Sequence, residues 1–407
     1  MWHNRTNQIF TYHGEIYADK AGYYIYLPFF LNYRADINAL PSDIEKKTGL
    51  GFKIDEGKII TKYTAGVAIL QIPFYLLSEF LFLVRPTGYA GFSLYHHKAI
   101  AFSGLFYSWI GFWFLFRFMR YYFEDKISFM IILSVMLATN TLYYCTKESN
   151  FSHIYSFFLI SVYLFLLKKT DFIRYTNTKI FFIFLTTTFL IVLIRPTNTV
   201  LVFTVFLFLD SNSLTNTLNR IYNFFMALAR YWWVSLAAFS IVILPQLLYW
   251  KYAYGHFITY SYKNEGFNWF NPHILEFLIA PNNGTFAFSP ILVFILLGIA
   301  ICLRRNYNHG YLLSVFFLIM VYLYSSWWCY SFGCSYGSRN MVDLYPLLSL
   351  GLGHFYKSVI NQKKVFLITL FFLILFSLIN IKMIFNFDMC MYVKNDWDWE
   401  AWIKLLL

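Results

Sequence analysis

The chain has 407 residues, of which 59% are hydrophobic, 23% aromatic and only 13% charged. Soluble domains carry charges on about a quarter of their residues, so this composition excludes an ordinary soluble protein and predicts an all-α protein that crosses a membrane many times. The net charge of +12 would suit a nucleic-acid partner. Its placement along the chain fits the control of membrane topology instead, and we expect no nucleic-acid binding.

Residues 1–97 are predicted to form a first outer loop that contains one apolar segment, 64–84. This segment carries Pro73 and Glu79, and a carboxylate inside a spanning helix is costly. We therefore expect 64–84 to lie in the membrane interface, with a true span as the alternative.

A transmembrane bundle is predicted over residues 98–384, because a span needs about 20 mainly apolar residues. Residues 179–209 are too long for one span and contain Arg195-Pro196, which predicts two short helices that meet at this proline. We expect about ten membrane helices in total. The other spans are predicted at 98–116, 127–145, 150–167, 231–250, 288–303, 311–326, 340–356 and 365–384.

The connections between these spans differ in charge from one side to the other. One set holds 14 Lys and Arg against four acids. The alternate set holds eight basic and seven acidic residues; it consists of 85–97, 146–152, the turn at Arg195, 251–287, 327–339 and the tail 385–407. The excess of positive charge marks the cytoplasmic side. Residues 1–97, the loops 251–287 and 327–339 and the tail are therefore expected outside. The cytoplasmic set is 117–126, 168–179, 210–230, 304–310 and 357–364.

Asp19 is the strongest candidate for a catalytic residue. It lies in the first outer loop just before Tyr23, where a carboxylate can deprotonate or orient an acceptor hydroxyl. The alternative is a loop carboxylate paired with its neighbour Lys20.

Three cations on the outer side are candidates for binding a donor phosphate: Lys62, Arg195 and Arg339. Lys62 precedes an expected helix start, which adds partial positive charge, and a guanidinium binds phosphate oxygens in a bidentate manner. The alternatives are a snorkelling lysine, an arginine that anchors a kink, and a local ion pair of Arg339 with Asp343.

Aromatic and polar residues around these cations suit sugar rings, hydroxyls and lipid headgroups. An aromatic belt at the membrane interface is the alternative for the rings, and a structural role is the alternative for His153. The predicted substrate-binding residues are Tyr23, Tyr63, His153, Tyr262, Glu265, Trp328 and Asp343.

Neither a metal site nor a nucleotide-binding motif is indicated. The sequence contains no GxGxxG, Walker or His-x-x-x-His motif, so we expect no required cofactor and predict no metal ligands, although a divalent ion is compatible with the chemistry. The five cysteines are scattered, and a disulfide between Cys329 and Cys334 on the outer face is one alternative.

The order of these segments resembles bacterial members of the GT-C glycosyltransferase superfamily, in particular mannosyltransferase-like proteins of cell-envelope gene clusters. Short stretches along nearly the whole chain carry the resemblance. They are 19–28, 62–66 with Pro73-Phe74, 91–93, 194–198, 262–267, and 327–339 with Asp343 and Pro346. The family pattern has a further spanning helix ahead of the acidic residue, whereas the sequence before Asp19 is polar.

The resemblance implies a GT-C-like bundle and an inverting transfer of a sugar from a polyprenyl-phosphate donor. The acceptor would be an envelope glycan, a lipid or a protein at the outer face of the bacterial inner membrane. The family's base would correspond to Asp19, and its phosphate-binding cations to Lys62 and Arg195 or Arg339. The alternatives are an O-antigen polymerase or ligase, and a transporter of lipid-linked glycans without catalysis.

Overall fold

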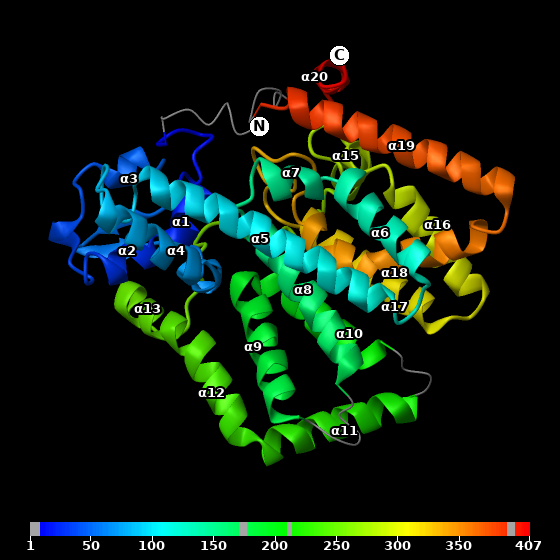
Figure 1. The fold of residues 1–407 in the computed structure, drawn as a ribbon, viewed down its shortest axis with the longest axis horizontal. Coiled ribbons are helices and arrows are strands. Elements are labelled where there is room, and N and C mark those ends of the chain that lie inside the picture. The colour runs from blue at the N-terminus through cyan, green and yellow to red at the C-terminus, as the bar shows by residue number, and fades with distance from the viewer. Residues whose placement is uncertain (1–8, 171–176, 210–213, 389–394) are drawn as a thin grey trace.

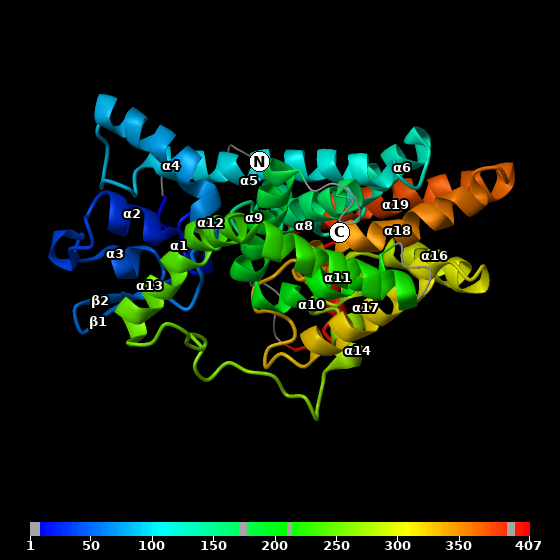
Figure 2. The same cartoon turned by 90° about the horizontal axis from the view of Figure 1, so that it is seen from below.

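The computed structural model describes residues 9–170, 177–209, 214–388 and 395–407, and these are mostly helical. Within these ranges the only sheet is a hairpin of β1 (Lys53–Asp55) and β2 (Lys58–Ile60). The prediction of an all-α fold is confirmed. In Figures 1 and 2 the hairpin and the first short helices lie together at one end of the long helices, on the left.

The elements follow the hydrophobic segments of the sequence. The first loop contains α1 (Asp19–Tyr24), α2 (Tyr26–Leu31), η2 (Ile37–Ala39) and α3 (Ile44–Lys47). The first half of the bundle contains α4 (Gly66–Val84), α5 (Leu94–Met119), α6 (Asp125–Leu137), α7 (Thr141–Thr146), α8 (Ser152–Lys169), α9 (Thr178–Ile194), η3 (Pro196–Asn198) and α10 (Thr199–Phe208). The second half contains α11 (Leu214–Arg230), α12 (Trp232–Val242), α13 (Leu244–Tyr254), α14 (Ile274–Ile279), α15 (Thr285–Phe288), α16 (Leu292–Arg304), α17 (Asn308–Ser325), α18 (Met341–Val359), α19 (Lys363–Asn386) and α20 (Trp399–Lys404).

Four of the described helices are long and apolar enough to cross a membrane, and the bent pair α11–α12 makes a fifth if it counts as one span. The four are α4, α5, α17 and α19. These helices support a membrane protein, but a bundle of about ten spans is not confirmed. Helix α4 passes this test of length and composition, and its position in the interface stays a prediction.

Two of the predicted spans are interrupted in the structure. The segment 127–145 divides into α6 and α7, where the side chain of Asn140 donates hydrogen bonds to the carbonyls of Tyr336 and Ser338. The segment 231–250 divides at Ile243, where Pro245 begins the next helix without a backbone N–H. The predicted break at Arg195-Pro196 is confirmed, since α9 ends at Ile194.

The core of the bundle depends on close helix contacts. A Cβ atom on Gly298 of α16 would lie 1.8 Å from the carbonyl oxygen of Gly351 on α18, and one on Gly104 of α5 would lie 1.8 Å from that of Ser149. These pairs of backbones pack together only because glycine has no side chain. The contact at Ser149 lies just before the start of α8, and the contact at Gly351 lies within α18; both helices carry residues of the candidate site.

Candidate functional site

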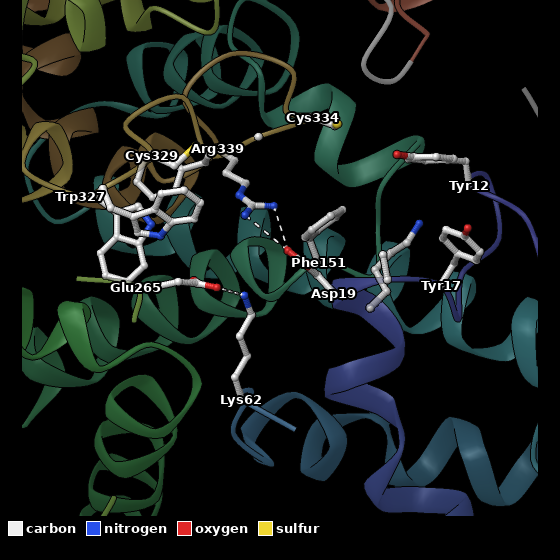
Figure 3. Close-up of a pocket in the computed structure, with 15 residues that line it drawn as sticks. Tyr12, Tyr17, Asp19, Lys62, Phe151, Glu265, Trp327, Cys329, Cys334 and Arg339 are labelled. Carbon is white, nitrogen blue, oxygen red and sulfur yellow. Dashed lines mark hydrogen bonds and ion pairs between the residues drawn. The ribbon is translucent and has the colours of Figure 1, made fainter. Parts of the chain in front are cut away.

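An open cavity of about 280 Å³ lies where the first loop meets the loops 251–287 and 327–339. Five predicted residues line it: Asp19, Lys62, Glu265, Trp328 and Arg339. Figure 3 shows these segments facing one another across the cavity, although Asp19 and Arg339 are 320 residues apart in the sequence. The polar residues that carry the predicted chemistry are thus brought together by tertiary contacts.

Asp19 binds Arg339 across the cavity. Asp19 lies in the first turn of α1. Both terminal nitrogens of the Arg339 guanidinium lie 3.4 Å from its Oδ2. Lys20, the alternative partner, donates instead to Glu148 at 2.7 Å, and both side chains of that pair are buried. The pairing of Asp19 with Lys20 is therefore wrong, and the carboxylate of Asp19, which is 34% exposed, faces the cavity.

Lys62 forms a second ion pair in the cavity, with Glu265. Its Nζ lies 2.5 Å from Oε1 of Glu265, and both side chains are about one-third exposed. The cavity wall beside Glu265 is built by a contact between two late loops, in which the N–H of Trp328 donates to the carbonyl of Gly266 at 2.9 Å. The cavity therefore contains two carboxylates and two cations that neutralise each other pairwise.

A second charged group lies behind the cavity, around Asp343. Arg195 Nε lies 3.0 Å from its Oδ2, and His153 Nδ1 lies 3.0 Å from its Oδ1. Asn198 also donates to Oδ2, and Arg195 donates to Asn340 at 2.7 Å. Asp343 is fully buried, so its charge depends on these partners.

This arrangement excludes the alternative of a local ion pair between Arg339 and Asp343. Asp343 binds Arg195 and His153, whereas Arg339 binds Asp19. Arg195, His153 and Asp343 do not line the cavity. Their roles with a substrate stay predictions, and what the structure places there is a buried polar network that joins α8, α9 and α18.

The three predicted tyrosines lie together between the cavity and this network. The rings of Tyr23 and Tyr63 are 4.4 Å apart, the ring of Tyr262 packs against Tyr63 at 6.3 Å, and the hydroxyl of Tyr23 donates to Ser152. Burial, and then the negative charge of Asp19, raises the pKa of the Tyr63 hydroxyl well above its ordinary value. The pKa of Tyr262 is also raised, chiefly by burial. These hydroxyls therefore stay neutral at physiological pH.

The charge of Arg339 is secured by its surroundings. Burial by itself lowers the pKa of the guanidinium, but the neighbouring Asp19 and tyrosines raise it above its ordinary value. Phe151 places its ring 5.2 Å from the guanidinium carbon and 5.8 Å from Nζ of Lys20. The ring of Phe332 lies 5.9 Å from the same carbon, so Arg339 is a permanent cation packed near two aromatic rings at the cavity.

Several residues that line the cavity were not predicted from the sequence. They are Tyr12, Tyr17, Ala18, Lys20, Phe151, Trp327, Cys329, Phe332, Gly333 and Cys334. Trp327 and Phe332 lie within the stretch that identified Trp328, but the pattern there does not distinguish a cavity from an aromatic belt. Phe151 directly follows a tight turn rich in polar residues, and that position is its only signal in the sequence.

The structure excludes the alternative of a disulfide between Cys329 and Cys334. Cys329 is a free thiol and Cys334 is in a disulfide, so the Cys329–Cys334 bond is wrong. No three His, Cys, Asp or Glu side chains in the described part of the chain are grouped to hold a metal ion.

We predict that an impermeant maleimide added to intact cells labels Cys329, which lines the open cavity. Cys145 and Cys302 are buried and should stay unlabelled. Peptide mapping would locate the label, and Cys329→Ser should remove it. Labelling of Cys329 only after lysis would place the cavity in the cytoplasm and contradict the outer-face assignment.

Comparisons with family models, with curated proteins and with solved structures found no match to this chain. The function is therefore inferred from the geometry of the cavity and from the residues that line it.

Proposed function

We propose that the protein is an integral-membrane glycosyltransferase that moves a sugar from a polyprenyl-phosphate donor to an envelope acceptor. One observation carries the proposal: a carboxylate and two cations from distant segments face one open cavity, namely Asp19, Lys62 and Arg339. A transfer of this kind needs a base for the acceptor hydroxyl and positive charge for the departing phosphate.

In the proposed reaction Asp19 accepts the proton of the acceptor hydroxyl. The hydroxyl oxygen attacks the anomeric carbon and forms the new glycosidic bond, while the bond from that carbon to the phosphate oxygen breaks. Polyprenyl phosphate leaves with the bonding electrons. Arg339 and Lys62 neutralise the charge that develops on its oxygens, and attack from the side opposite the phosphate inverts the anomeric configuration.

The two ion pairs of the cavity fit the arrival of an anionic donor. Arg339 is occupied by Asp19 and Lys62 by Glu265, so a phosphate competes with each carboxylate for its cation. When Arg339 binds the phosphate, Asp19 loses a stabilising positive charge and becomes a better proton acceptor. Donor binding and activation of the base are thereby coupled.

Aromatic side chains supply the sugar-binding surface of the proposal. Trp327 and Trp328 both line the cavity, and the side chain of Trp328 is 52% exposed. Indole rings pack against the apolar faces of sugars and also favour the membrane interface. The rings lie beside Glu265, which can accept hydrogen bonds from sugar hydroxyls.

The proposal places the cavity at the outer face of the bacterial inner membrane. The Lys and Arg excess of the opposite connections supports this side. The disulfide at Cys334, which also lines the cavity, supports it independently, because disulfides persist in oxidising compartments.

A transfer assay in proteoliposomes tests the function. The protein is mixed with radiolabelled polyprenyl-phosphate hexoses and pentoses and an envelope-lipid extract, and both labelled product and free polyprenyl phosphate are measured. We expect both to form, and Arg339→Gln to abolish them, whereas the exposed Arg85→Gln should leave them unchanged. Movement of intact donor across the bilayer without release of polyprenyl phosphate would indicate a transporter. Extension of a diphosphate-linked glycan would indicate the polymerase or ligase.

Replacing Lys62 should weaken donor binding more than it slows chemistry. In Lys62→Gln we expect KM for the donor to rise about tenfold, the effect of losing one charge-assisted contact. The rate at saturating donor should change less. Lys263→Gln, an exposed neighbour of Glu265 outside the cavity, is the matched control. An unchanged KM in Lys62→Gln would exclude contact of this lysine with the phosphate.

A further inference from the structure

Helix α11 is amphipathic along its whole length. Its polar residues follow one side of the helix, and two of them are arginines; no acid occurs between Leu214 and Arg230. The opposite side is apolar over more than half of the circumference. The polar side consists of Asn216, Asn219, Arg220, Asn223 and Arg230.

Part of the apolar side packs on the bundle. The ring of Phe224 lies 4.7 Å from that of Phe206 near the end of α10, and Tyr231 lies 6.0 Å from Phe181 near the start of α9. Helix α11 therefore crosses the neighbouring ends of α9 and α10, as Figure 1 shows along the lower edge of the molecule. The charge pattern assigns these ends to the cytoplasmic side.

Ile221, Ala227 and Leu228 also pack against the bundle. The other five large apolar side chains of α11 are exposed, and they form one stripe. Each of them is more than half exposed, and they recur at helical spacing: Leu214, Leu218, Tyr222, Phe225 and Met226. The stripe continues onto α12, which leaves α11 at an angle of 83°. There it begins with Trp232 and Trp233 and continues with Leu236 and Ile241, all of them exposed.

We infer that α11 lies flat in the cytoplasmic interface of the membrane, with its stripe in the acyl chains of the inner leaflet. Three observations favour lipid as the occupant. The stripe is continuous with the apolar surface of α12, and two tryptophans mark the bend at interfacial depth. The polar side has no acid and ends in the exposed Arg230, which can bind anionic headgroups, whereas Arg220 on the same side donates to the carbonyl of Leu209. The angle of 83° then turns α12 from the membrane plane into the bilayer. The inference does not depend on the proposed enzymatic function.

Spin-label depth measurements on the full-length protein in anionic liposomes test this arrangement. Single cysteines replace Leu218 and Phe225 on the stripe, Asn219 and Asn223 on the polar side, and Leu236 and Ile241 on α12. The background lacks the thiols of Cys145, Cys302 and Cys329 and retains the disulfide at Cys334. Collisions with oxygen and with a water-soluble nickel chelate report the depth of each label.

A flat helix predicts equal depths for Leu218→Cys and Phe225→Cys, although the two positions are about 10 Å apart along the helix axis. The labels at Asn219 and Asn223 should collide several-fold more often with the nickel chelate. The α12 positions should differ in depth by several Å. A depth difference of about 10 Å along α11 would make it part of a span and overturn the inference. Stripe labels that are immobile and shielded from both reagents would show a covering protein or second copy instead, and would equally overturn it.

Discussion

Replacing Asp19 with asparagine should reduce the rate of sugar transfer by about 10²- to 10⁴-fold, the range expected when a general base is lost. Asparagine keeps the size of the side chain but cannot take the proton of the acceptor. The substitution also releases Arg339 from its ion pair at 3.4 Å, so KM for the donor should stay the same or fall. The measurement is initial-rate kinetics in the proteoliposome assay at varied donor concentration.

Two matched variants distinguish the loss of a base at Asp19 from a general effect of removing one negative charge. Asp55→Asn removes the same charge from an exposed strand position outside the cavity and should retain full activity. Glu265→Gln removes the other carboxylate of the cavity and should affect donor or sugar binding more than the rate at saturation. If Asp19→Asn remained active while Glu265→Gln lost the rate, the base would be Glu265 and the mechanism proposed for Asp19 would be wrong.

Replacing Asp343 with alanine should lower the free energy of unfolding by about 3–5 kcal/mol, the usual cost of leaving a buried charge without its partner. Asp343 is fully buried, and Arg195 beside it is only 17% exposed. The variant leaves the guanidinium facing His153 without a carboxylate. A lower midpoint of thermal unfolding in detergent would report the loss.

A double variant that removes both charges of the ion pair gives the control for this prediction. In Arg195→Met with Asp343→Leu both charges are removed, and apolar side chains fill the space, so most of the stability should return. Asp55→Ala, at an exposed position of β1, should have little effect. An Asp343→Ala protein as stable as the parent would show that the network contributes no net stability, and its residues would then need another reason for their burial.

The class of the fold could be predicted from the sequence because hydrophobicity acts locally. A run of apolar residues forms a helix in lipid wherever it occurs, since only a helix satisfies its own backbone hydrogen bonds there. The break at Arg195-Pro196 was predictable for the same reason, because proline lacks the N–H that the helix needs. The break near Asn140 was missed because Asn140 donates to carbonyls nearly 200 residues away. The break at Ile243 was also missed, although Pro245 gives the same local signal as Pro196.

The sequence by itself determined that the fold is helical and rich in residues typical of a membrane interface. It also singled out five polar or aromatic residues as candidates for a site: Asp19, Lys62, Glu265, Trp328 and Arg339. Only the tertiary structure decided their partners. Asp19 pairs with Arg339 and not with its neighbour Lys20, and Asp343 pairs with Arg195 and not with a residue one turn away. A charge pairs with whichever opposite charge the packing brings within reach, and that packing arises from contacts across the whole chain.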